Sequence, residues 1–190
     1  SDSDRSYGWD NEYGNDEQKV EQFKVATTLV SNQDFLKFVQ AWGYKKARYW
    51  TAEGRQWLHY TQSQHPKFWR TTLSGKFLQR NLFSEMPLPM DWPVEVNYLE
   101  AKAYCNWMRE RIGEPVRLPV EAEWSALRLS ELGEASGEGN INLDQYASSC
   151  PVTENRHGRL YDVTGNVWQW TESPIDGYPG FNVHPWYDDF

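Results

Sequence analysis

Two stretches of the sequence carry most of the information about the fold: RLPVEAEW (residues 117–124) and YDVTGNVWQW (residues 161–170). In the first, Pro119 and Glu121 are typical of the first turn of a helix. The fixed φ of proline suits that turn, and a carboxylate is stabilised near the positive end of the helix dipole. In the second, two tryptophans separated by one residue predict a short, buried strand over residues 167–171.

The helix that follows Pro119 lacks an ordinary N-cap. Val120 precedes it, and a valine side chain cannot accept the hydrogen bond that serine, threonine, asparagine or aspartate accepts at this position. We expect the missing cap to cost about 1 kcal/mol unless another group supplies the acceptor. Trp124 and Leu127 follow at a spacing that places both on the inward face.

Two further helices are predicted closer to the N-terminus. One covers Gln33–Trp42, is capped by Ser31 or Asn32 and is terminated by Gly43. Its apolar residues at helical spacing are Phe35, Leu36, Val39 and Trp42. The other begins with a capping-box pattern and has the inward stripe Ala101, Tyr104, Cys105, Met108 and Ile112, between Asn97 with Glu100 at its start and Gly113 at its end.

The remaining segments show weaker patterns. Residues 1–18 are polar and predict an extended arm, whereas Val20–Thr27 alternates enough to predict a short strand. Residues 44–91 have no sustained period, so we expect a long irregular segment that aromatic side chains hold in place. Residues 131–139 are rich in glycine, glutamate and serine, which favours an exposed loop.

The composition limits both the core and the function. A chain of 190 residues with eleven Trp, eleven Tyr and eight Phe predicts a single domain whose interior is filled by a few large rings. The net charge of −8 gives no electrostatic support for binding nucleic acid or an anionic membrane. The sequence has no apolar run that could span a bilayer and no leader-like start, so we expect a soluble, cytoplasmic protein.

The two cysteines, Cys105 and Cys150, are expected to stay unpaired in a reducing compartment. Cys105 lies on the apolar stripe of its helix and is interpreted as a small buried hydrophobe. Cys150 precedes Pro151 in a loop. We therefore predict no disulfide.

The two opening stretches resemble the formylglycine-generating-enzyme-like (sulfatase-modifying-factor) domain, in which they are usually spelled RLPTEAEWE and GNVWEW. Three flanking segments, YGWDNEYG (7–14), WPVEVNYLEAKAYCNW (92–107) and GFNVHPWYDDF (180–190), resemble the branch of 5-histidylcysteine sulfoxide synthases of ovothiol biosynthesis. The synthases of hercynylcysteine sulfoxide, in ergothioneine biosynthesis, are similar to a lesser degree. The resemblance implies an α+β fold with a C-type-lectin-like core, low in regular secondary structure. The domain would cover residues 1–190 and lack its final strands, as a piece of a larger protein.

The resemblance also implies the chemistry. Such enzymes join the sulfur of cysteine to the imidazole of histidine with O2, and they hold Fe(II) with three histidines in a separate N-terminal helical domain. The histidines of this chain do not form close pairs on one helix face, so we expect no transition-metal site here. They are His59, His65, His157 and His184.

Calcium is a second implied metal. The family's second calcium site would map onto the side chains of Asp162 and Gln169 and the carbonyls of Gly165 and Val167, an oxygen set that suits a hard cation. The alternative is that Asp162 and Gln169 only form hydrogen bonds within the turn. The first family site would fall on Asn140, Ile141, Asp144 and Tyr146.

The segment 173–190 is the expected location of the catalytic residues, because it is rich in proline and glycine and loops of this kind on a rigid scaffold often carry function. The resemblance implies an active-site tyrosine here, and Tyr178 and Tyr187 are the candidates. Asp188 and Asp189 are the candidates for binding the amino group of an amino-acid substrate. The alternative for Tyr187 is that it only packs the loop.

Two functions of other classes remain open. A lectin-like scaffold also suits a non-catalytic binding module. Formylglycine generation would require a late pair of cysteines, and Cys105 and Cys150 fall on other motifs. A longer reading frame with spaced histidines upstream would favour the synthase.

Overall fold

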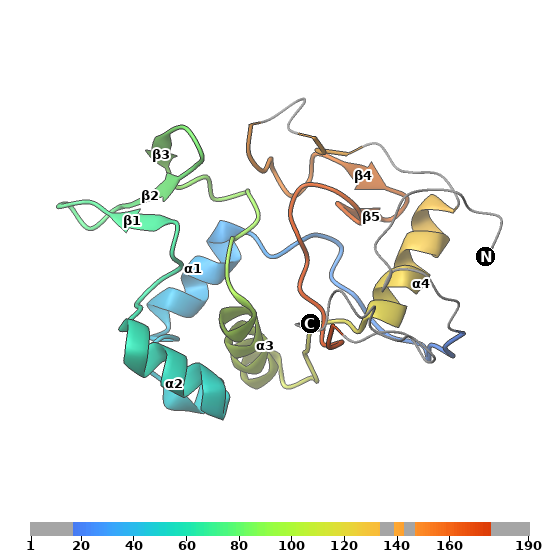
Figure 1. The fold of residues 1–190 in the computed structure, drawn as a ribbon, viewed down its shortest axis with the longest axis horizontal. Helices are drawn as coiled ribbons and strands as arrows, with labels where there is room; N and C mark the ends of the chain where they lie inside the picture. The colour runs from blue at the N-terminus through green and yellow to red at the C-terminus, as the bar shows by residue number, and fades with distance from the viewer. Residues whose placement is uncertain (1–16, 134–138, 143–146, 176–190) are drawn as a thin grey trace, which may run out of the picture. The chain divides into compact units, whose positions relative to one another are not determined.

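The computed structural model describes residues 17–133, 139–142 and 147–175 (Figure 1). The chain divides into two compact units, Lys24–Glu172 and a unit made of Ser1–Phe23 with Ser173–Phe190. Helices and small antiparallel sheets are both present, which confirms the mixed α+β class. The elements in chain order are α1 (Asn32–Gln40), η2 (Ala47–Tyr49), α2 (Ala52–Thr61), β1 (Trp69–Thr71), β2 (Phe77–Arg80), β3 (Glu85–Pro87), α3 (Tyr98–Ile112), α4 (Glu121–Leu132), β4 (Arg156–His157) and β5 (Leu160–Tyr161).

Helix α1 begins as predicted but ends earlier. The hydroxyl of Ser31 accepts a hydrogen bond from the amide of Asp34 (3.2 Å), so Ser31 is the N-cap. At the other end, the Gly43 amide donates to the Phe38 carbonyl (2.9 Å) and the Trp42 amide to Val39 (3.1 Å). These two bonds form a Schellman motif. Trp42 occupies its left-handed position with φ 64°.

The predicted inward position of Trp42 is therefore wrong, since its side chain is 59% exposed. Phe38, which the spacing argument overlooked, is fully buried, as are Asn32 and the predicted Phe35. Gly43 is required at the helix end because a Cβ built on it would lie 2.3 Å from the Phe38 ring. The chain thus leaves α1 by passing directly over the buried Phe38 ring.

Helix α3 confirms its predicted bounds. Asn97 accepts from the Glu100 amide, Glu100 accepts from the Asn97 amide, and Gly113 ends the helix with φ 72°. The buried face is rotated from the predicted stripe, because Ala103 and Trp107 are buried and Ile112 is half exposed.

The prediction of a long irregular segment over residues 44–91 is wrong. It contains α2 and a three-stranded antiparallel sheet in the order β1-β2-β3. The hydroxyl of Thr51 caps α2 by accepting from the Gly54 amide (3.0 Å), and a turn that includes Gly75, at φ 77°, joins β1 to β2. The strands have three or four residues, too few to produce a period.

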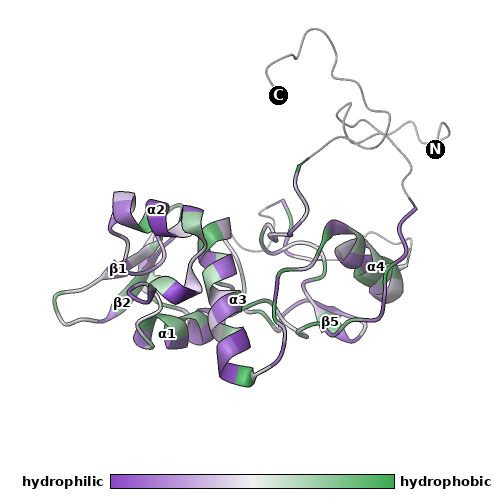
Figure 2. Cartoon of the chain, turned by 90° about the horizontal axis from the view of Figure 1, so that it is seen from below, coloured by the Kyte–Doolittle hydropathy of each residue, from purple (hydrophilic) through white to green (hydrophobic). Residues whose placement is uncertain are grey.

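The core is an aromatic cluster, as the composition predicted. Its ring contacts include Phe35 stacked on Tyr104 (centroids 5.4 Å apart) and Phe38 tilted against Trp107 (5.7 Å). In Figure 2 the helices carry both hydrophobic and hydrophilic residues, as expected where one face is buried. The buried members are Phe35, Phe38, Tyr44, Tyr49, Trp50, Trp69, Leu88, Ala103, Tyr104 and Trp107.

Helix α4 confirms the third predicted helix, and its start shows how the missing cap is partly replaced. The Glu123 carboxylate accepts from the Val120 amide (2.9 Å) and is paired with the Arg117 guanidinium (2.6 Å). Arg117 holds the pKa of Glu123 below its ordinary value. The Trp124 indole donates to the Val163 carbonyl (3.2 Å), which joins the two opening stretches of the sequence.

The predicted strand over Val20–Thr27 is wrong, because residues 17–27 lie outside any strand. The Thr27 carbonyl accepts from the Tyr161 amide (2.9 Å), but most side chains of this stretch are exposed. Within the described ranges, no helix has the length and apolar character needed to cross a membrane.

Candidate functional site

The stretch 161–170 forms a turn, so the predicted buried strand over 167–171 is wrong. Asp162, Gly165 and Asn166 have φ angles of 48°, 80° and 64°. Asparagine and aspartate tolerate this left-handed region because their short side chains bond to nearby backbone. Trp168 is fully exposed and Trp170 half exposed, which contradicts the expectation that both belong to the core.

Asn166 holds this turn against the segment before β4. Its Oδ1 accepts from the Cys150 amide (2.8 Å), and its Nδ2 donates to the Cys150 carbonyl (3.1 Å). The side chain thus satisfies both polar groups of one residue, as a neighbouring strand would. The same Nδ2 also donates to Asp162 Oδ2 (3.0 Å).

Asp162 is completely buried. Its second oxygen accepts from Asn155 Nδ2 (3.0 Å), and its backbone carbonyl accepts from Gln169 Nε2 (2.8 Å). Burial raises the pKa of Asp162, against the opposing effect of the Asn155 and Asn166 bonds. Both predicted side-chain ligands for calcium therefore form hydrogen bonds inside the turn, which is the alternative role that the sequence left open.

The four predicted calcium ligands lie within one turn of eight residues. The Gly165 carbonyl accepts from the Val167 amide (2.9 Å), and the Asp162 carbonyl accepts from the Gln169 side-chain amide (2.8 Å). A carboxylate, two carbonyls and a side-chain amide oxygen form a donor set of the type that calcium binds.

The other mapped calcium site is only partly within the described ranges. Asn140 is buried, and its Nδ2 donates to the Ser148 carbonyl (2.8 Å) and to Asn166 Oδ1 (3.3 Å). Ile141 is exposed. Asp144 and Tyr146 lie outside the described residues, as do the catalytic and substrate-binding candidates Tyr178, Tyr187, Asp188 and Asp189.

A second set of contacts, which the sequence did not predict, holds the end of the turn to α3. The Trp170 indole donates to the Val96 carbonyl (2.9 Å), and its ring meets Tyr98 edge to face. The Glu172 carboxylate accepts from the Tyr98 hydroxyl (3.1 Å) and forms an ion pair with Lys102. The spacing of Tyr98 and Lys102, one helical turn apart, was the available signal.

The described histidines are not gathered into a metal site. His59 lies in the last turn of α2, and buried His157 on β4 accepts at Nδ1 from the Val163 amide (3.1 Å). Across residues 17–133, 139–142 and 147–175, no group of three or more His, Cys, Asp or Glu side chains could hold a metal ion. His184 lies outside these ranges.

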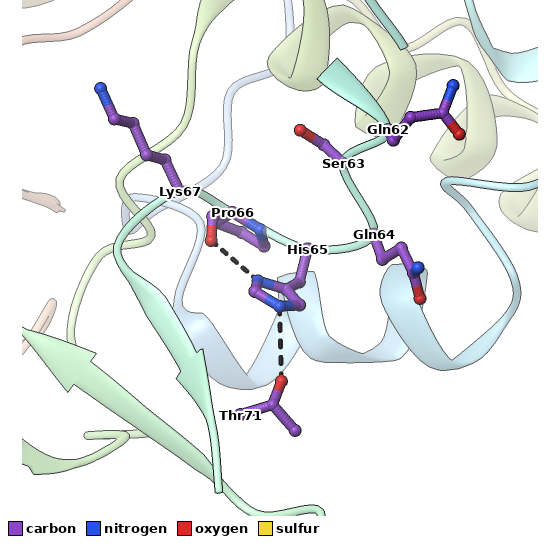
Figure 3. A pocket seen from close by; sticks show the side chains of 7 residues that line it. All are labelled: Gln62, Ser63, Gln64, His65, Pro66, Lys67 and Thr71. Carbon is purple, nitrogen blue, oxygen red and sulfur yellow. Dashed lines mark hydrogen bonds between the residues drawn. The ribbon is translucent and has the colours of Figure 1, made fainter. Parts of the chain in front are cut away.

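His65 borders a shallow polar pocket of about 420 Å³ between α2 and β1 (Figure 3). Its Nδ1 lies 3.0 Å from the Pro66 carbonyl oxygen and its Nε2 lies 3.4 Å from the Thr71 hydroxyl. Lys67 points away from the imidazole in Figure 3. Both ring nitrogens thus have partners, one in the loop and one on β1, and the pocket gathers no further titratable group around His65.

The cysteines are both buried thiols. The prediction for Cys105 is confirmed, and burial raises its pKa to about 11. Burial also raises the pKa of Cys150, whose sulfur accepts from Asn155 Nδ2 (3.4 Å). A thiol is a nucleophile only as the thiolate, so neither environment suits nucleophilic catalysis.

This geometry defines an α+β domain with an aromatic core and a turn that is held by the side chains of Asn166 and the buried Asp162. Residues 2–183 match the Sulfatase-modifying factor enzyme 1-like domain family, FGE-sulfatase. The chain belongs to this family.

Three relatives illustrate its range. The hercynine oxygenase of Mycobacterium tuberculosis is 30% identical over 179 residues, 85% of this chain and 40% of the relative. Ergothioneine biosynthesis protein 1 of Schizosaccharomyces pombe is 24% identical over 97% of this chain and 21% of its own length. The inactive C-alpha-formylglycine-generating enzyme 2 of Mus musculus is 28% identical over 90% of this chain and 64% of its own length. The chain thus spans about two fifths of the length of the hercynine oxygenases it matches.

Proposed function

We propose that this chain is the sulfatase-modifying-factor domain of a sulfoxide synthase that joins the sulfur of cysteine to the imidazole of histidine. In such a reaction a thiol S–H and an imidazole C–H give up four electrons in total. O2 accepts them, supplying one oxygen to the sulfoxide and one to water. The observation that carries the proposal is the 30% identity to a hercynine oxygenase over 85% of the chain.

The imidazole substrate has two candidates. The segments 7–14, 92–107 and 180–190 resemble the ovothiol-type enzymes, which use histidine itself. The names of two relatives, hercynine oxygenase and ergothioneine biosynthesis protein 1, favour hercynine as the substrate. We propose histidine first, because the flanking segments are the more detailed resemblance.

The chain would contribute residues of the segment 173–190. A tyrosine hydroxyl stays neutral near pH 7 and can donate a hydrogen bond or a proton, which is the proposed role of Tyr187 or Tyr178. The carboxylates of Asp188 and Asp189 would bind the amino group of an amino-acid substrate. The C-type-lectin-like core would act as the rigid support of this segment, in a cytoplasmic protein.

Fe(II) would supply the oxygen chemistry from an N-terminal helical domain of the same protein. The described part of this chain offers no matching set of ligands, and we assign none to it. The role proposed for Asp188 and Asp189 is to bind the substrate, and the role proposed for Tyr187 or Tyr178 is to hold a proton near the reacting sulfur.

Two alternative functions are less well supported. Formylglycine-generating enzymes are among the relatives, at 27% identity for that of Thermomonospora curvata. However, the burial that raises the pKa of Cys105 to about 11 argues against thiol chemistry at this position. A non-catalytic binding module remains the alternative from another class.

Assay of the full-length protein, loaded anaerobically with Fe(II) and then given O2 and cysteine, tests the proposal. Histidine and hercynine are supplied in parallel, and the products are separated by mass spectrometry. We expect a coupled sulfoxide from histidine. A coupled product from hercynine alone would establish the ergothioneine type, and the absence of any coupled product would refute the synthase.

We propose, as a separate matter, that Asp162, Gly165, Val167 and Gln169 hold Ca²⁺ as a structural ion. The buried carboxylate of Asp162, whose pKa burial raises, would be neutralised by the ion. Calorimetric titration of metal-stripped protein should give one binding event and a rise in Tm. Absence of both in millimolar calcium would reject the site, and Asp162→Asn is the matched variant that should weaken binding.

A further inference from the structure

Positive charge is concentrated in one stretch of this acidic chain. The stretch between Asp34 and Glu85, residues 35–84, contains nine Lys and Arg residues and one acidic residue, Glu53, so that its net charge is +8. The whole chain has a net charge of −8. The stretch lies entirely within the described residues and contains α2, β1, β2 and most of α1. The net charge of the whole chain thus conceals a basic region.

The three-stranded sheet turns one of its faces toward α1. Asn32, the first residue of α1, accepts at Oδ1 from the Trp69 indole (3.2 Å) and donates from Nδ2 to Gln79 Oε1 (3.0 Å). Trp69 on β1 is paired in register with Gln79 on β2, and both side chains are buried. Because successive side chains of a strand point to opposite faces, Arg70 and Arg80 lie on the other face of the sheet, where both are exposed.

Apolar side chains border these two arginines. The Arg80 amide donates to the Phe68 carbonyl (2.8 Å), and Phe68 is 40% exposed. The turn that joins β2 to β3 presents Leu82 and Phe83, which are 71% and 79% exposed. This side of the sheet (β1, β2 and β3 in Figure 1) is therefore both basic and apolar. We define the outer sheet face as Phe68, Arg70, Leu78, Arg80, Leu82 and Phe83.

The two arginines of the outer sheet face have hydrogen-bond donors available for a ligand. The Arg70 Nε lies 3.9 Å from a carboxylate oxygen of Glu85, which is too far for a hydrogen bond. Within the described ranges, the Arg80 side chain forms no ion pair. A guanidinium carries its N–H donors in a planar fork that matches a carboxylate. Two such groups on one face of a sheet therefore suit a ligand with more than one carboxylate.

We propose that the outer sheet face binds an acidic polypeptide segment that also carries apolar side chains. Its carboxylates pair with Arg70 and Arg80. Its apolar side chains cover Leu82 and Phe83, whereas a nucleic acid offers no aliphatic side chain to bury them. A long polyanion or an anionic membrane would also reach the rest of the chain, which is strongly acidic, and would be repelled by it. A short peptide segment contacts this face alone. The inference does not rest on the proposed function.

Fluorescence anisotropy tests the inference with a short labelled peptide composed of glutamate and leucine, titrated with the full-length protein. Wild-type protein should bind the peptide with a Kd that rises with ionic strength. Arg70→Gln with Arg80→Gln should weaken binding about 10-fold or more, and Phe83→Ser should weaken it about threefold. The three positions are exposed, so the Tm of each variant should stay near that of wild type.

The matched control removes two charges from the same basic stretch but outside the sheet. Lys37→Gln with Lys45→Gln should leave Kd within about twofold of wild type, and a peptide with glutamine in place of glutamate should not bind. Absence of binding by wild type, equal losses in the two double variants, or equal binding of the two peptides would overturn the inference.

Single-stranded RNA and vesicles that contain phosphatidylserine are titrated in parallel. Neither should bind the outer sheet face more tightly than the acidic peptide does. Tighter binding of either by wild type, lost in Arg70→Gln with Arg80→Gln, would assign the face to a polyanion or a membrane and reject the polypeptide.

Discussion

The region from Ser31 to Ile112 and the region from Gly139 to Glu172 are stabilised in different ways. The first surrounds a cluster of stacked and tilted aromatic rings, with Phe38 at its centre. The described part of the second contains two strands of two residues each, and the Asn166 side chain bonds both backbone groups of Cys150. Burial of apolar surface stabilises the first region, and this effect does not depend on the direction of the contacts. The second region depends on the geometry of a few hydrogen bonds. The comparison predicts different responses to substitution.

The largest effect is expected from Phe38→Ala in the aromatic region. Phe38 is fully buried and contacts Tyr44, Tyr49, Trp50, Tyr104 and Trp107 through its ring. Its removal should lower the free energy of unfolding by about 3–5 kcal/mol. Urea denaturation measures the loss, and Leu73→Ala, at a fully exposed position, should stay within about 0.5 kcal/mol of wild type. Equal losses would contradict the aromatic core.

Asn166→Ala should be nearly as damaging to the other region. It leaves the polar groups of Cys150 and one oxygen of Asp162 without their partner, at an expected cost of about 2–4 kcal/mol. Asn166→Gly tolerates the φ of 64° equally well but makes no side-chain bond. If Asn166→Gly were as stable as wild type, backbone strain rather than hydrogen bonding would explain the residue.

Tyr44→Phe tests a polar group inside the aromatic region. The Tyr44 hydroxyl donates to Glu100 (2.5 Å), and burial raises the pKa of Glu100 above its ordinary value of 4.5. Because the folded pKa is raised, the contribution of Glu100 is complete below 4.5 and is lost as the pH rises through the folded value. Loss of the donor should therefore cost about 1–3 kcal/mol near neutral pH and less in acid. Denaturation across a pH series measures it, and a cost independent of pH would contradict the assignment.

Glu172 should show the opposite dependence on pH. Its pKa is lowered, so its contribution is present above 4.5 and is lost as the pH falls through the folded value. Because Lys102 lowers the pKa of Glu172, Lys102→Met should lose less stability than wild type as the pH falls. Wild type and Lys102→Met should thus differ in stability near neutral pH and converge in acid.

The smallest expected effect is a gain. Val120→Thr supplies the missing cap of α4 and should stabilise the chain by about 1 kcal/mol. Val120→Ser should give a similar gain, whereas Val120→Ala supplies no acceptor and serves as the control. A gain in all three variants would indicate that relief of valine strain, and not capping, is responsible.

The same contrast explains which sequence predictions succeeded. Ser31, Asn97 and Gly113 were identified because caps act through the residues beside them in sequence. The content of residues 44–91 was missed because α2 and three short strands leave no period to detect. The pattern of two tryptophans in 167–171 suggested burial. The structure has a turn here and no strand. Hydrogen bonds from Asn166 to Cys150, sixteen positions away, hold this turn, and Trp168 is exposed.

The candidate site divides in the same way. The resemblance to the family implied the calcium set of Asp162, Gly165, Val167 and Gln169, whose members lie within eight residues, and calcium binding there stays a prediction. The contacts of Glu172 with Tyr98 and Lys102 span 74 and 70 positions, so the spacing of Tyr98 and Lys102 places them on one helix face but does not identify Glu172 as their partner. Long-range polar contacts of this kind are found only when the fold brings the partners together.

The bonds between Asn166 and Cys150 bear on how this region tolerates changes of length. In a β-ladder, a slip of one residue turns every side chain to the opposite face. Here the Asn166 side chain forms hydrogen bonds with the backbone amide and the backbone carbonyl of a single residue, Cys150. Residues inserted next to Cys150 shift no register at this contact, because Cys150 lies outside the β4–β5 ladder. The region can therefore gain or lose loop residues over evolution while the turn that presents Trp168 keeps its shape.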